Sequence, residues 1–139
     1  MLSNTLNTNE VKNSAGTEVE FERQKISDRS TVFSQISETP AQPHRLSISH
    51  LESGSGLQLR RRSLVRVDKT IISSVDSVTP VTVSAYTVLD IPVGAITTSA
   101  EPANVLAELV SFIASLGAST TILYDGTGNG AKSLISGSL

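Results

Sequence analysis

Hydrophobic and polar residues alternate along five stretches in the first two thirds of the chain, a pattern typical of half-exposed β-strands. The predicted strands are Thr17–Gln24, Asp28–Ser37, His44–Leu51, Leu57–Thr70 and Val81–Val93. The turn sequence "NSAG" precedes the first of them, so the segment "NTNEVKN" before it is the expected partner of a hairpin. Prolines and the sequence "ESGSG" interrupt the pattern between strands, which favours short connections and an antiparallel sheet.

The period changes to that of a helix after residue 97. Apolar residues recur at helical spacing between Thr98 and Gly117, and Gly117 is placed as the C-cap. Thr98 and Glu101 fit a capping box, and Pro102 allows a start at Glu101 instead. The segment Ala118–Gly126 is a second short helix in this prediction, and the Gly/Ser-rich remainder is a weakly ordered tail. The expected fold class is therefore α+β. The expected organisation is a single domain over 1–125, with a hairpin about 8–24, a sheet about 28–93 and helices about 99–125, followed by the tail 126–139.

The middle strands each carry one apolar and one polar row. Leu46, Ile48 and His50 share one face of their strand, and the next two strands repeat the pattern with Val65 and Val67 and with Val83 and Ala85. The opposite rows hold the residues that we single out as candidates for binding: Arg45, Ser47, Ser49, Arg60, Arg62, Arg66 and Tyr86.

Charge makes this polar surface unusual. The formal net charge is −2, yet six of the 11 Lys and Arg residues lie between Arg45 and Lys69. On the first two of these strands only Asp68 opposes the arginines. Arginine forks bind phosphates and guanine edges, hydroxyl groups leave room for an unstacked base, and tyrosine can stack on one. The pattern favours binding of single-stranded or looped RNA, and the alternative is an ordinary solvated sheet face.

Other functional classes find little support in the sequence. The absence of cysteine excludes disulfides, thiolate nucleophiles and zinc fingers, and no carboxylate pairs occur at metal-ligand spacing. The segment "DGTGNGAKS" lacks the spacing of a phosphate-binding loop. His44 and His50 lie outside any catalytic motif, and His50 is expected to be structural. No apolar run reaches the length of a membrane span and no signal peptide is visible. We therefore expect no enzyme activity, cofactor, metal, membrane or small-molecule substrate.

The composition points to burial against a partner chain. Hydrophobic residues make up 38% of the chain and aromatic residues 4%. One helix of about 27 Å could cross a sheet about 24 Å wide, but little else remains to bury the rim and the edge strand. A second copy of the chain would bury the rim of the sheet and pair with its edge strand.

The chain resembles the coat proteins of the single-stranded RNA bacteriophages (leviviruses). The resemblance rests on the order of the N-terminal hairpin, "HRLSISHL", "RRRSLVRVDK", "AYTVLDIPV" with its Ile-Pro step, and "AEPANVLAELVSFIASLG". It implies a dimer with one continuous sheet, helices that pack on the partner's sheet, and a T=3 icosahedral shell whose inner face contacts RNA. It also implies location in the virion, after assembly in the bacterial cytoplasm.

The resemblance further suggests roles for individual residues. Ser47 and Ser49 match hydroxyl positions of pockets for the adenines of an RNA hairpin, whose binding represses translation of the replicase. Arg45 and Arg62 match flanking basic positions, and Arg66 matches one used across the dimer. Tyr86 and Val88 replace smaller or polar residues of relatives, and the loop Thr70–Pro80 corresponds to the loop at the symmetry axes of the shell.

Two alternatives remain at this point. One is a dimeric RNA-binding regulator that forms no shell. The other is a small-molecule enzyme whose site is not exposed by sequence motifs.

Overall fold

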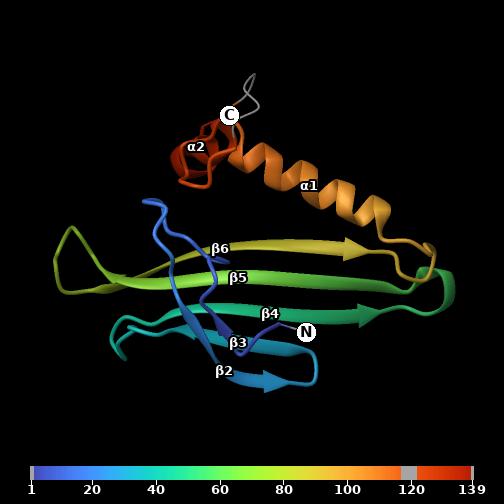
Figure 1. Ribbon diagram of the computed structural model, residues 1–139, viewed down its shortest axis with the longest axis horizontal. Coiled ribbons are helices and arrows are strands. Elements are labelled where there is room, and N and C mark those ends of the chain that lie inside the picture. Colours follow the sequence, from blue (N-terminus) through green and yellow to red (C-terminus); the bar gives the residue numbers. More distant parts are fainter. Residues whose placement is uncertain (1, 117–121, 139) are drawn as a thin grey trace. The chain divides into compact units, whose positions relative to one another are not determined.

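The computed structural model describes residues 2–116 and 122–138 and divides into two compact units. The first unit comprises residues 1–8 and 20–97 and contains the sheet. The second comprises residues 9–19 and 98–139 and contains the two helices. The expected α+β class, with the sheet first in the chain and the helices last, is confirmed (Figure 1).

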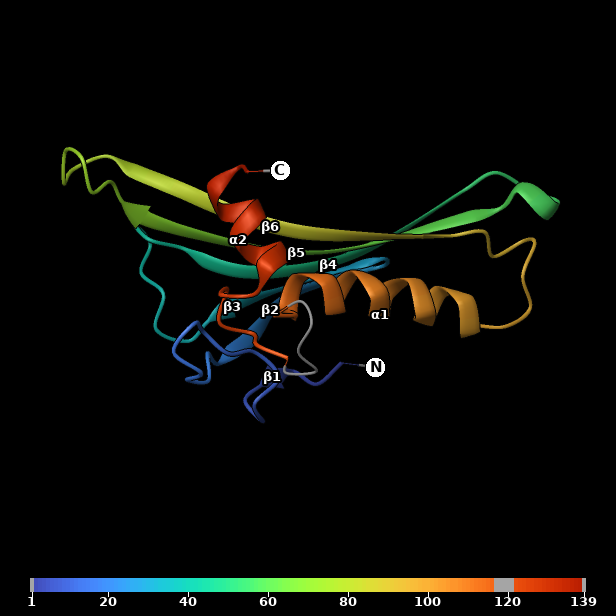
Figure 2. The same cartoon turned by 90° about the horizontal axis from the view of Figure 1, so that it is seen from above.

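The sheet has six antiparallel strands, and each strand pairs with the next one in the sequence. Figure 2 shows it as a single twisted layer. The strands are β1 (Thr5–Leu6), β2 (Phe21–Ser27), β3 (Ser30–Gln35), β4 (His44–Ser53), β5 (Arg60–Ile72) and β6 (Pro80–Ile91). The sheet is therefore a simple meander, and β6 forms one of its edges.

The core of the sheet lies on one face of β1 to β4. Phe21 and Phe33 have no exposed surface, and Leu6 and Leu46 are nearly as buried. The register explains this grouping, since Leu6 lies opposite Phe21 and Phe33 lies opposite Leu46. The ring of His44 meets Phe21 edge-on at 5.1 Å, which closes this cluster next to the start of β4.

The N-terminal hairpin differs from the prediction. The strand that pairs with β2 is β1, which precedes the predicted partner, and β2 begins four residues later than expected. The predicted turn does form: the side chain of Asn13 accepts hydrogen bonds from the amides of Ala15 and Thr17, at 2.9 and 3.0 Å. It joins only an isolated bridge between Lys12 and Glu18. Val11 and Val19 flank this bridge and are joined by a backbone hydrogen bond of 2.9 Å. On its other side Asn13 and Thr17 already belong to the turn, so the pairing stays limited to a single bridge.

The strand predicted over Leu57–Thr70, which carries Arg60, Arg62 and Arg66, begins later than predicted. A 3-10 turn over Gly56–Gln58 replaces its first residues, and β5 starts at Arg60. Gly54 and Gly56 have φ of 86° and 56°, and this left-handed conformation turns the chain before β5. At its other end β5 continues to Ile72, so the connecting loop is shorter than the predicted Thr70–Pro80.

The long helix is α1 (Ala100–Ala114). The predicted capping box is wrong: the N-cap is Ser99, and it makes no side-chain capping bond. Pro102 lies in the first turn, where a missing amide costs little. The predicted C-cap Gly117 lies outside the described residues.

The second helix lies later in the chain than predicted. It is α2 (Asn129–Ser136), inside the segment that the sequence suggested to be a weakly ordered tail. Residues 122–126 of the predicted helix are not helical, and 118–121 lie outside the described residues. The glycines before and within α2 explain the difference. A Cβ on Gly128 would lie 2.7 Å from the carbonyl oxygen of Ile113, and one on Gly130 would lie 2.5 Å from that of Phe112. These glycines therefore allow the close contact of α2 with α1.

No described helix is long and apolar enough to cross a membrane. No group of three or more His, Asp or Glu side chains in the described part of the chain is arranged to hold a metal ion.

Candidate nucleic-acid interface

The strand register places the seven candidate residues on one side of β4, β5 and β6, here called the polar face. Directly opposed residues of an antiparallel sheet point to the same side. Ser47 of β4 lies opposite Arg66 of β5, which lies opposite Tyr86 of β6. The remaining candidates occupy the same rows at steps of two residues, as the alternation predicts.

The other side of the same strands is apolar, as expected. Leu46 lies opposite Val67, and Ile48 lies opposite Val65. His50 belongs to this side and lies 2.9 Å, Nδ1 to Oγ, from its cross-strand neighbour Ser63. That hydrogen bond supports the interpretation of His50 as a structural residue.

One end of the polar face carries a cluster of Arg66, Asp68 and Ser84. The Nε of Arg66 donates to both carboxylate oxygens of Asp68 at 2.8 Å, and its terminal amino group donates to Ser84 Oγ at 3.2 Å. The Ser84 hydroxyl in turn donates to Asp68. The hydrogen bond from Ser84 is the main cause that lowers the pKa of Asp68; Arg66 adds to it and desolvation opposes it. The carboxylate therefore stays charged and fixes the guanidinium of Arg66 next to Tyr86.

The other end carries a second cluster, in which one carboxylate serves two arginines. Arg60 Nε donates to Asp90 Oδ1 at 3.0 Å, and Arg62 Nε donates to Asp90 Oδ2 at 3.2 Å. Desolvation raises the pKa of Asp90, but the hydrogen bonds and charges of the two arginines outweigh it, so the net shift is downward. Asp90 thus bridges Arg60 and Arg62, which are neighbours on the polar face of β5.

The fourth arginine also has an acidic partner. Arg45 lies 3.7 Å from Glu38, whose carboxylate accepts a hydrogen bond from the backbone amide of His44 at 2.9 Å. On the polar face of β4 and β5 the opposing acid is Asp68, as predicted, and the other two partners come from outside these strands. Asp90 lies on the last strand and Glu38 lies in a loop, so neither shares a strand with the arginines that it pairs. The sequence places Asp90 on the same face as Tyr86, because the two residues are an even number of positions apart on one strand. Its two arginine partners follow only from the register of β5 and β6.

The arginines remain accessible despite these pairs. The exposed fractions of the side chains are 50% for Arg60, 67% for Arg62 and 45% for Arg66. Between the two clusters, Ser49, Leu64 and Val88 form a row of cross-strand neighbours. Tyr86 is 66% exposed and borders this row. The polar face thus offers guanidinium groups at both ends, an aromatic ring beside one of them, and the apolar side chains of Leu64 and Val88 between them. This combination suits unstacked bases and phosphates.

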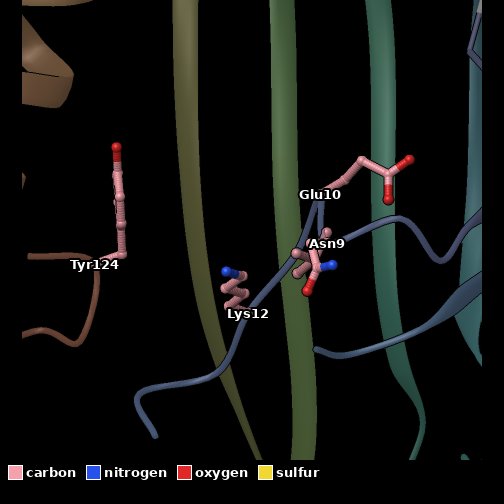
Figure 3. A pocket seen from close by; sticks show the side chains of 5 residues that line it. Asn9, Glu10, Lys12 and Tyr124 are labelled. Atoms are coloured by element: carbon pink, nitrogen blue, oxygen red, sulfur yellow. The ribbon is translucent and has the colours of Figure 1, made fainter. Parts of the chain in front are cut away.

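Two hollows elsewhere offer less specific chemistry. One, of about 480 Å³ in the second unit, is lined by Asn9, Glu10, Val11, Lys12 and Tyr124. Figure 3 shows that Tyr124 comes from a separate segment of the chain and that the other labelled side chains extend from one irregular stretch of the N-terminal segment. The other, of about 600 Å³ on the apolar side of the sheet, lies near Arg23 and His50. His50, which lines the second hollow, is hydrogen-bonded to Ser63, and Ser63 is not among the lining residues.

Comparison with known proteins identifies the architecture. No protein-family model and no curated protein matches the sequence. Among solved structures, the fold matches the bacteriophage EMS014 coat protein with a TM-score of 0.67 and 14% identity, over 87% of both chains. It matches the virus-like particle of Beihai levi-like virus 32 with a TM-score of 0.54 and 24% identity, over 68% of this chain and 75% of the other. It matches the bacteriophage GA capsid protein with a TM-score of 0.53 and 18% identity, over 87% and 85%. Together with the six-stranded meander and the two C-terminal helices, these matches show that the chain has the coat-protein fold of the single-stranded RNA phages.

Proposed function

We propose that the chain is a capsid protein that dimerises, assembles into an icosahedral shell and binds RNA with its polar face. The observation that carries the proposal is the fold match with a phage coat protein over 87% of both chains. A structural role of this kind requires surfaces for self-association and a surface for nucleic acid, and the chain offers both.

The first self-association surface is the open edge at β6. In the described part of the chain, β6 pairs with β5 alone along its 12 residues. Its side chains Val81, Val83, Tyr86 and Val88 are between 40% and 66% exposed. A long edge with apolar side chains is a template for pairing with another strand. Antiparallel pairing with β6 of a second copy would continue the sheet and satisfy the backbone groups of both edges.

The second surface is apolar and occurs in both units. Six large apolar residues of the helical region are between 37% and 62% exposed: Val105, Leu106, Leu109, Val110, Phe112 and Leu116. On the sheet, Val65 and Ile71 of β5 are also exposed, at 44% and 40%. Surfaces of this kind normally mark protein interfaces. In the proposed assembly, helices of one copy cover the apolar side of its partner's sheet.

The polar face is the RNA-binding surface of the proposal. In a dimer joined at β6 the two polar faces would form one continuous surface, with Tyr86 of each copy on the strand at the joint and Arg66 on the next strand. RNA inside the shell, and a hairpin that represses translation, are the expected ligands of this surface. T=3 is the expected shell size.

The test is expression of the full chain in bacteria, followed by size-exclusion chromatography and electron microscopy. We expect megadalton particles that contain nuclease-protected RNA. Dimers that bind RNA without forming particles would favour the regulator. A monomer that binds no RNA would overturn the proposal.

Matched variants separate RNA binding from assembly. Arg62→Ala and Arg66→Ala remove guanidinium groups from the polar face and should lower the RNA content of purified particles. Arg61→Ala is the control, because Arg61 adjoins Arg62 in sequence but lies on the opposite side, across from Ile91. Equal RNA content in all three variants would argue against the polar face as the binding surface.

A further inference from the structure

The polar face contains nearly as many negative charges as positive ones. Its four arginines carry four positive charges, and their partners Glu38, Asp68 and Asp90 carry three negative charges. This set of seven side chains therefore has one excess positive charge. A surface built only to neutralise phosphates would not need the two acids that lie on the face itself, Asp68 and Asp90.

The geometry of the ion pairs shows how they act. In all three pairs with an aspartate the carboxylate engages Nε of the arginine. Binding through this edge fixes the plane of the guanidinium and leaves terminal amino groups to donate elsewhere. In Arg66 one of them reaches Ser84, so this arginine is held at two points. The clusters thus orient their arginines while cancelling most of their charge.

Cancelled charge changes the way in which a surface binds nucleic acid. Affinity that comes from phosphate neutralisation releases counterions, falls steeply with salt and does not depend on sequence. An arginine that is already paired with a carboxylate contributes less to the affinity that comes from phosphate neutralisation. Hydrogen bonds to base edges and stacking on an aromatic ring keep their value, and these contacts distinguish one nucleic acid from another.

We propose that Asp68 and Asp90 are specificity-determining residues that act as built-in counterions, lowering the affinity of the polar face for phosphate charge and thereby favouring unstacked RNA bases over polyanions in general. This inference rests on the proposed RNA-binding function of the same face. It predicts that loss of either carboxylate strengthens binding of any nucleic acid and weakens the preference for single-stranded RNA over duplex DNA.

The structure suggests that neutral variants of these acids will fold. The side chains of Asp68 and Asp90 are 30% and 29% exposed, and their arginine partners are at least 45% exposed, so water can solvate a guanidinium that loses its partner. Asparagine keeps the size of aspartate and one acceptor oxygen. Asp68→Asn and Asp90→Asn are therefore the appropriate changes.

The experiment measures binding of the full-length protein, at nanomolar concentration, to a labelled oligouridine and to a duplex DNA of equal length. Two excess charges per dimer predict that oligouridine affinity falls about 7-fold between 50 and 200 mM salt. The Asp90→Asn dimer has four excess charges, which predict a fall in oligouridine affinity of about 50-fold over the same range. The dimer of the double variant Asp68→Asn/Asp90→Asn has six, which predict a fall of about 300-fold. In both variants duplex DNA should gain more affinity than oligouridine.

The control is Asp28→Asn, which makes the same charge change in the exposed turn between β2 and β3. Its salt dependence should equal that of the wild type. An unchanged slope in Asp90→Asn, or an equal increase in Asp28→Asn, would overturn the inference and leave the proposed function intact. Failure of the wild type and of every variant to bind RNA would instead overturn the RNA-binding function itself.

Discussion

The two halves of the sheet are built from the same alternating pattern but reach different states of burial. In β1 to β4 the apolar side contains four buried residues: Leu6, Phe21, Phe33 and Leu46. In β5 and β6 no residue is buried, and valines are exposed along both strands. The first half completes a small core within the chain, whereas the second half presents an open surface and an open edge.

The difference follows from what each half can bury. Two of the three phenylalanines of the chain lie in β2 and β3, and β1 pairs with β2 so that Leu6 lies opposite Phe21. The apolar side of β5 and β6 carries valine, alanine, leucine and isoleucine but no aromatic residue, since Tyr86 lies on the polar face. Alternation therefore specifies which way a side chain points. Whether the apolar face is buried within one chain depends on how many large apolar side chains that face carries. The exposed half is where we propose that a second copy binds.

The largest expected effect of a substitution on stability is in the buried half. Phe33→Ala removes a ring with no exposed surface and should lower the free energy of unfolding by about 3–5 kcal/mol. Urea denaturation measures the change. The control is Val83→Ala in β6, at a side chain that is 62% exposed in the single chain. A comparable loss of stability in both variants, measured below the concentration at which particles form, would show that the two halves do not differ as described.

A smaller effect is expected where the N-terminal segment closes the core. The guanidinium of Arg23 donates to Asn4 Oδ1 at 3.0 Å and to the carbonyl oxygens of Leu2 and Ser3 at 2.6 and 3.1 Å, and lies 5.3 Å from the centre of the Phe33 ring. Lysine cannot reproduce this fork, so Arg23→Lys should cost about 1–2 kcal/mol. Hydrogen exchange should show faster opening of β1. The same change at Arg61 in the open half should alter stability by less than about 0.5 kcal/mol.

The buried half should also respond to pH through His44. Burial beside Phe21 lowers the pKa of His44 below its ordinary value of 6.5, Lys69 lowers it further, and Glu38 partly opposes the shift. The unfolded chain therefore binds the proton more readily than the folded one. The stability that neutral His44 contributes is present above pH 6.5 and is lost as the pH falls below it, toward the lower folded-state value.

His44→Gln should flatten the dependence of unfolding free energy on pH in this window. Denaturation curves at pH 8 and pH 5 measure it for both proteins. Parallel changes in the two proteins would exclude His44 as the titrating group.

The smallest effect on folding should come with the largest effect on assembly. Val83→Glu places a charge on the edge strand opposite Lys69, with which it can pair, so the free energy of unfolding should change by less than about 0.5 kcal/mol. A charge on the edge should nevertheless prevent pairing of two β6 strands and abolish particles in electron micrographs. Ile26→Glu is a matched control, since Ile26 is also 62% exposed but belongs to β2. Particles formed by Val83→Glu would argue against association through β6.

The sequence was sufficient to predict the sides of the middle strands, because a period of two assigns each residue to a face without knowledge of its partner. It could not predict the pairing of Arg60 and Arg62 with Asp90, since those residues are about 30 positions apart and meet only through the register of β5 and β6. The position of α2 was missed for a similar reason. Glycine at 128 and 130 suggested disorder in the sequence, whereas in the structure it permits close contact with α1.

The order of the strands has a consequence for how the chain acquires its structure. Because each strand pairs with its predecessor, every hairpin can zip onto the one before it as the ribosome releases the chain. The aromatic cluster of β2 to β4 can form before β5 and β6 have emerged, and it then serves as a nucleus for them. The edge strand β6 is synthesised last, when the strands that it pairs with and follows are already present. This order shortens the time in which an unpaired β6 could cause a nascent polypeptide to aggregate.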